Sequence, residues 1–86
     1  MSQPNGSPTV SNEYRLALNN YLQNRFRSTA CLSWAYERDG PDHAIQWTAI
    51  AYFNNIEYGR GTNHQKGAAA EVAAYQTLVA LSTSTN

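Results

Sequence analysis

Residues 39–66 of this 86-residue chain alternate turn signals with a strand pattern, and they constrain the fold more than any other stretch. The turn residues D-G-P-D come first, and residues 45–53, I-Q-W-T-A-I-A-Y-F, then place side chains alternately on two faces, as a strand does. Asn54 and Asn55 tolerate the positive φ angles of a tight hairpin turn. The stretch therefore predicts an antiparallel hairpin, whose second strand is short and covers residues 56–59. A glycine-rich lead into a helix follows it.

Helical periodicity flanks this stretch on both sides. A first helix is expected from a cap at Ser11 or Asn12 to about residues 24–26. Its apolar face carries four residues: Tyr14, Leu18, Tyr21 and Leu22. A second, alanine-rich helix is expected from about residue 66 to 81, and its small side chains allow a close approach to a sheet.

One more strand is expected over residues 30–37, where large and small side chains alternate. The element order α-β-β-β-α predicts a two-layer α+β fold, with a three-stranded antiparallel sheet and both helices packed on one face. We expect one domain over residues 11–82, a flexible N-terminal tail over residues 1–10 and a polar C-terminal tail over residues 83–86.

Composition excludes several classes of function. Six basic and six acidic residues balance, so binding to a polyanion must come from local placement of charge. The acids are scattered singly, and no histidine or cysteine spacing suits a metal, so we expect no enzymatic activity, no cofactor and no metal. The single cysteine, Cys31, is expected to be a small buried side chain. The chain shows neither a membrane-spanning run nor a signal peptide, which favours an intracellular protein, in the cytoplasm over the nucleus.

The second face of the first helix is polar. Leu16, Asn19, Asn20 and Gln23 recur at helical spacing, so three amide side chains line up on one exposed stripe. The pattern by itself leaves two interpretations open. The stripe is either a solvated helix surface or a row of hydrogen-bonding groups that meets sugar hydroxyls and base edges in a groove.

From about residue 13 to 81 the chain resembles the double-stranded-RNA-binding domain family. The sequence L-N-N-Y-L-Q at residues 18–23 is similar to the family's first helix, and G-P-D-H at residues 40–43 to its G-P-x-H loop. W-T-A-I-A at residues 47–51 matches its F-T-V-x-V strand, and Y-G-R-G at residues 58–61 its approach to the second helix. K-G-A-A-A at residues 66–70 falls on its K-K-x-A-K box. These motifs occur in the family's order and at its intervals.

The resemblance implies a non-catalytic module that recognises A-form duplex by shape and 2′-hydroxyls, spanning about 16 base pairs. The first helix and the loop at residues 40–43 would each enter a minor groove, and the start of the second helix would meet phosphates. The RNA-binding residues implied are Leu16, Asn19, Asn20, Gln23, Pro41, Asp42, His43, Arg60, His64 and Lys66.

Two departures from the family motif lead to other interpretations. Gly67 and Ala70 stand at lysine positions, which predicts fewer phosphate contacts and weaker duplex binding. One alternative is a protein-interaction or homodimerisation module, with Ile50 and Tyr52 as an exposed apolar surface on the sheet. A further alternative is a domain taken from a larger RNA-processing enzyme, in which case catalysis lies outside these residues.

Overall fold

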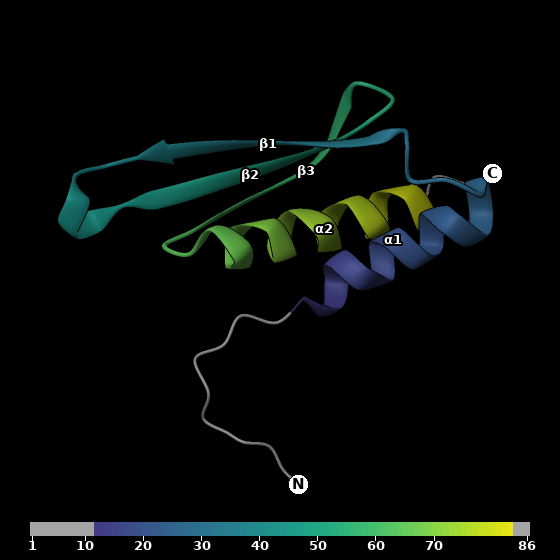
Figure 1. Cartoon of the computed structure of the whole chain (residues 1–86), viewed down its shortest axis with the longest axis horizontal. Helices are drawn as coiled ribbons and strands as arrows, with labels where there is room; N and C mark the ends of the chain where they lie inside the picture. Colours follow the sequence, from purple (N-terminus) through teal and green to yellow (C-terminus); the bar gives the residue numbers. More distant parts are fainter. Residues whose placement is uncertain (1–11, 84–86) are drawn as a thin grey trace, which may run out of the picture.

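The computed structural model describes residues 12–83, and their element order is the predicted one. The elements are α1 (Glu13–Phe26), β1 (Leu32–Asp39), the short 3₁₀ helix η1 (Asp42–Ala44), β2 (Gln46–Phe53), β3 (Ile56–Asn63) and α2 (Lys66–Thr83). Both helices lie on one face of the sheet, as Figure 1 shows. The predicted two-layer α-β-β-β-α fold is confirmed.

Some boundaries differ from the predicted ones. β3 continues to Asn63, well beyond the predicted end at residue 59, and β1 is displaced by two residues from the predicted range of 30–37. Thr83, assigned from sequence to the C-terminal tail, is the last residue of α2. The expected N-terminal tail over residues 1–10 and the rest of the C-terminal tail lie outside the described residues.

The three strands form an antiparallel sheet in the order β1-β2-β3. Asn54 and Asn55 have φ angles of 55° and 67°, so the predicted hairpin turn between β2 and β3 is confirmed. Tyr36 pairs with Ala49, which in turn pairs with Gly61, and this row faces the helices. A register shift between Ala51 and Tyr52 marks a bulge in the β2–β3 pairing.

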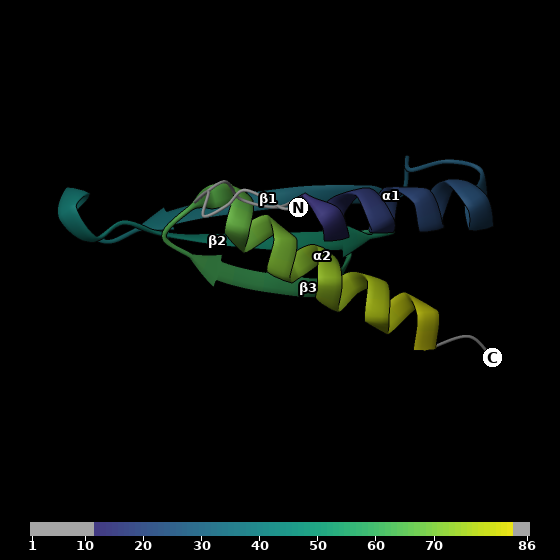
Figure 2. The same ribbon diagram turned by 90° about the horizontal axis from the view of Figure 1, so that it is seen from below.

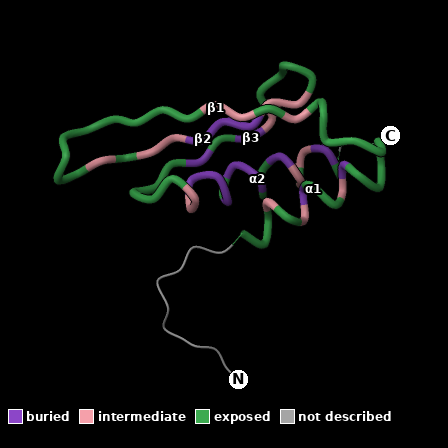
Figure 3. The backbone as a smooth tube through the Cα atoms, viewed as in Figure 1, coloured by how far each residue is buried: buried purple, intermediate pink, exposed green. Residues whose placement is uncertain are grey.

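The alanine-rich side of α2 lies almost in backbone contact with β3. A Cβ atom on Gly59 would lie 2.3 Å from the carbonyl oxygen of Ala73, and one on Gly61 would lie 2.4 Å from that of Ala69. Because neither position leaves room for a side chain, the two glycines allow the helix to approach this strand. They are therefore part of a strand under a helix, and Figure 3 shows buried residues concentrated where α2 faces the sheet.

The second part of the core joins the two helices. Leu18 and Leu22 of α1 are fully buried against Ala74 and Leu81 of α2, as their predicted place on the apolar face of α1 requires. The hydroxyl of Tyr21 donates a hydrogen bond of 3.3 Å to the carbonyl oxygen of Leu81. Figure 2 shows the helices side by side under the sheet, with α2 beneath β2 and β3.

One of the two predicted cap positions of α1 is found, and the expected burial of Cys31 is wrong. Asn12 is the N-cap residue of α1, but its side chain makes no capping hydrogen bond, and Ser11 lies outside the described residues. The carboxylate of Glu71, from α2, accepts hydrogen bonds from the first turn of α1 in its place. Cys31 is exposed, because β1 begins one residue later and leaves it in the preceding turn.

Candidate nucleic-acid interface

The polar stripe of α1 is exposed as predicted. Leu16 is 52% exposed, and the three amide residues that share its side of the helix, Asn19, Asn20 and Gln23, are exposed as well. The opposite side of α1 is occupied by the buried Leu18 and Leu22, so the stripe points away from the core. Asparagine and glutamine side chains each carry a donor and an acceptor, which suits hydroxyl partners.

The loop between β1 and β2 has a defined backbone. Gly40 has φ of 93°, a conformation that L side chains rarely adopt, and a Cβ atom there would lie 2.5 Å from the carbonyl oxygen of Ala44. The Gly40 N–H donates to Oδ1 of Asp39 at 2.9 Å. The Ala44 N–H donates to the carbonyl oxygen of Pro41 at 2.8 Å and closes the 3₁₀ turn. Glycine is therefore required at the entry to this loop.

The loop presents its side chains to solvent at the far end of the hairpin. Pro41, Asp42 and His43 are all exposed, and Figure 3 shows an exposed tip extending beyond the helices. Arg38 Nη2 lies 3.5 Å from Oδ1 of Asp42, a pair so exposed that it adds little stability. The side chain of His43 is thus exposed and accessible to a binding partner.

The ammonium group of Lys66, at the first residue of α2, lies against aromatic rings. Its Nζ is 4.5 Å from the ring centroid of Tyr36 and 5.3 Å from that of Trp47. The Tyr36 ring also stacks on Trp34, with centroids 6.1 Å apart and an interplanar angle of 8°. The cation–π contacts hold the Lys66 ammonium group beside the β1–β2 hairpin. The sequence motifs did not assign Tyr36 and Trp47 to the site.

The connection from β3 to α2 is held by side chains on both sides of it. Asn63 Oδ1 accepts the Gln65 N–H at 3.0 Å, an Asx turn that leads into the helix. His64 Nδ1 lies 3.2 Å from the carbonyl oxygen of Ile45, and because a carbonyl only accepts, Nδ1 carries the proton in this contact. His64 therefore ties the start of α2 to the start of β2, and its Nε2 is the nitrogen left for a partner.

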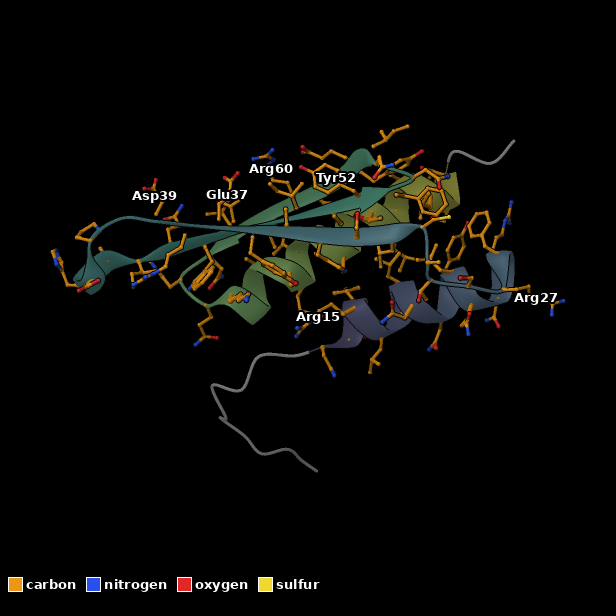
Figure 4. All side chains as sticks on the ribbon, turned by 45° about the horizontal axis from the view of Figure 1, so that its top comes forward. Arg15, Arg27, Glu37, Asp39, Tyr52 and Arg60 are labelled. Atoms are coloured by element: carbon orange, nitrogen blue, oxygen red, sulfur yellow. The ribbon has the colours of Figure 1, made fainter. Side chains whose placement is uncertain are left out.

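Arg60 lies apart from Lys66. It points from the outer face of β3, and its Nε and Nη2 each lie 3.0 Å from a carboxylate oxygen of Glu57. Hydrogen bonding from Arg60 lowers the pKa of Glu57. Figure 4 shows Arg60 on the same side of the sheet as Glu37 and Tyr52, whereas Arg15 lies on the helix side. The structure does not bring Arg60 together with the other residues of the predicted interface.

Two further residues differ from their expected setting. Ile50 is only 2% exposed and Tyr52 is half-buried, so the expectation of an exposed apolar surface is wrong for Ile50. Ile50 lies in the central strand of the sheet, where it pairs with Ala35 of β1 on one side and with Arg60 of β3 on the other. Ala70 is 1% exposed within the core, so a lysine at this position would have to leave the packed interior.

Comparison with known proteins adds no identification: no family model matches the chain, and no curated protein is significantly similar to it. Between residues 12 and 83, no three histidine, cysteine, aspartate or glutamate side chains gather closely enough to hold a metal ion. Neither of the two helices in this part of the chain has the length and hydropathy needed to cross a bilayer.

Proposed function

We propose that this domain binds double-stranded RNA without catalysis, by the shape of the A-form duplex. The polar stripe of α1 and the loop at residues 40–43 would enter successive minor grooves, and Lys66 would meet the phosphates between them. The β1–β2 loop and the first turn of α2 lie toward the same end of the molecule in Figures 1 and 2. One elongated ligand could therefore contact both of them.

The observation that carries the proposal is the β1–β2 loop. Its positive-φ glycine and 3₁₀ turn place His43 beyond the helices, with no core neighbour that explains a histidine there. A minor groove of A-form RNA is wide and shallow and displays 2′-hydroxyls, so an exposed imidazole and nearby carbonyl oxygens have partners in it. The three amides of the α1 stripe supply the same chemistry at a second groove.

The phosphate contacts support only modest affinity. Lys66 is the basic residue at the start of α2, where the positive end of the helix dipole also favours an anion. The adjacent Gly67 adds no charge, and Ala70 is buried. Since the chain has no net charge, affinity must depend strongly on this one lysine and on low salt.

A fluorescence titration with an RNA duplex of about 20 base pairs, compared with DNA of the same sequence at several salt concentrations, tests the proposal. Lys66→Ala should weaken binding and reduce the salt slope by about one. His43→Ala should weaken binding with an unchanged slope. Arg60→Ala is the matched control, because it removes a cation from the outer face and should leave both quantities unchanged.

Preference for RNA over DNA, with the slope change confined to Lys66→Ala, would support the proposal. Absence of RNA binding at low salt would refute it. A slope change for Arg60→Ala equal to that for Lys66→Ala would show that the duplex does not dock on the surface described above.

A further inference from the structure

The last residues of β1 divide their charges between the two faces of the sheet. Glu37 and Asp39 point to the outer face, as Figure 4 shows. Successive residues of a strand point to opposite faces, so the side chain of Arg38 lies on the helix-facing side. The strand pairing agrees, because Arg38 is opposite Trp47, whose side chain packs against the alanines of the core. The end of β1 therefore presents its cation on the helix-facing side and its two acids on the outer face.

Arg38 lies next to the site of Lys66, on the side toward the β1–β2 loop. The Lys66 ammonium group lies over the rings of Tyr36 and Trp47. Arg38 is two residues after Tyr36 on the same face, which is about 7 Å farther along the strand. The hairpin extends beyond the first turn of α2, as Figure 1 shows, and Arg38 is exposed. Two cations, one from α2 and one from β1, therefore occupy neighbouring positions on this side of the hairpin.

The guanidinium group of Arg38 is held only weakly by the protein. Its Nη2 lies 3.5 Å from Oδ1 of Asp42, and the two side chains are 53% and 101% exposed. An ion pair this long and this well hydrated contributes little binding energy. A guanidinium has five N–H donors in a planar fork that fits the oxygens of a phosphate. Arg38 therefore has donors to offer to an anionic ligand, and the contact with Asp42 directs them toward the loop.

This position supplies a charge that α2 lacks. The further lysine positions of the family motif are Gly67 and Ala70 here, and Ala70 is buried in the core. If the loop at residues 40–43 enters a minor groove and Lys66 meets the phosphates beside it, the RNA backbone passes between these two contacts. Arg38 lies between them, on the side of the sheet that carries Lys66.

We infer that Arg38 is a second phosphate-binding residue of the duplex interface, beside Lys66. It binds the RNA backbone between the minor groove that the β1–β2 loop enters and the phosphates at the start of α2. The inference rests on the proposed function and adds to it a residue that lies outside the family motifs. It also explains how a domain with one lysine at the start of α2 neutralises more than one phosphate.

The salt dependence of RNA binding by the full chain, measured with a duplex of about 20 base pairs, tests the inference. Arg38→Gln removes the charge and keeps a polar side chain, and it should reduce the salt slope by about 0.9. Between about 50 and 200 mM salt, its affinity should then fall about 3.5-fold less than that of the wild type. Arg38→Lys keeps the charge and should keep the wild-type slope, because the slope counts neutralised phosphates.

Arg60→Gln is the matched control. The Arg60 side chain is 50% exposed and pairs with a nearby acid, as the Arg38 side chain does, but it lies on the outer face. Its removal should leave the slope unchanged. Arg38→Gln combined with Lys66→Ala should lower the slope by about 1.8, because each cation neutralises its own phosphate.

The outcomes separate this inference from the proposed function. A wild-type slope for Arg38→Gln, together with a reduced slope for Lys66→Ala, would overturn the inference and leave the proposed function standing. Equal slope changes for Arg38→Gln and Arg60→Gln would also overturn it, because the effect would then come from net charge. Absence of RNA binding by the wild type at low salt would refute the proposed function and the inference with it.

Discussion

Glu71 of α2 binds the side chain of Arg15 and at the same time holds the first turn of α1. Its Oε2 lies 2.8 Å from Arg15 Nε, and its two carboxylate oxygens accept the N–H groups of Tyr14 and Arg15 at 2.9 and 3.0 Å. The first N–H groups of a helix have no partner within the helix, and a carboxylate near them is favoured by the helix dipole. One side chain therefore caps α1 and joins it to α2.

Removing this carboxylate should destabilise the fold clearly. Glu71→Ala should lower the free energy of unfolding by about 1–3 kcal/mol, because two backbone N–H groups and the Arg15 side chain lose their acceptor. Urea unfolding followed by circular dichroism measures the change. Glu57→Ala, which removes the acid of the exposed pair with Arg60, is the control and should leave the free energy of unfolding nearly unchanged. Equal losses for both variants would contradict the capping role of Glu71.

The contribution of Glu71 should depend on pH. Burial raises the pKa of its carboxyl group, but hydrogen bonds from the Arg15 side chain and from the N–H groups of Tyr14 and Arg15 outweigh burial and hold the pKa below 4.5. A depressed pKa in the folded state adds stability that is present above pH 4.5 and is lost as the pH falls through the folded value. The stability difference between wild type and Glu71→Gln should therefore be larger at pH 7 than near pH 3. A difference that is independent of pH would show that ionisation of Glu71 plays no part.

The glycines of β3 should not tolerate a methyl group. Gly61→Ala would place its Cβ 2.4 Å from the Ala69 carbonyl oxygen and 2.6 Å from the Val72 Cβ, so α2 would have to move off the strand. We expect a loss of about 1–3 kcal/mol in the free energy of unfolding, the range typical of overpacking. Thr62→Ala, at the adjacent exposed position, should cost less than about 1 kcal/mol. If the two substitutions had similar effects, the helix would not lie against the strand as described.

Tyr36 should affect RNA binding through Lys66. Tyr36→Leu removes the nearer of the two rings that hold the Lys66 ammonium group, and it should weaken duplex binding about two- to five-fold, equivalent to about 0.5–1 kcal/mol. The control is a double-mutant cycle: in a Lys66→Ala background, Tyr36→Leu should have no further effect. Additive losses would mean that Tyr36 acts on RNA independently of the lysine.

Adding a charge beside Lys66 should strengthen binding. Gly67→Lys should tighten RNA binding and steepen the salt slope by about 0.9, because one more phosphate would be neutralised. Gly67→Ala separates this effect from the gain in helix propensity, and it should leave the slope unchanged. An unchanged slope for Gly67→Lys would mean that the start of α2 does not face the phosphates.

Local patterns in the sequence predicted the elements and their order. The asparagine pair specified the β2–β3 turn, the spacing of Leu18 and Leu22 specified the buried side of α1, and the alanines of the second helix specified a close contact with the sheet. Each of these signals depends on neighbours within a few residues in the chain. The interface residues were proposed from the family motifs, and their exposure on α1 and on the loop agrees with that proposal.

The sequence alone determined the helices, the hairpins and the two-layer architecture, because periodicity and turn chemistry are local. Only the tertiary structure decided that the strand continues beyond Gly59 through Gly61, and that both glycines lie under a helix that passes over them. It likewise decided the partners of Glu71 and of Lys66 and the burial of Ile50. Each of these contacts is between residues that are far apart in the chain. Local sequence patterns do not specify such contacts, because they form only when the chain folds.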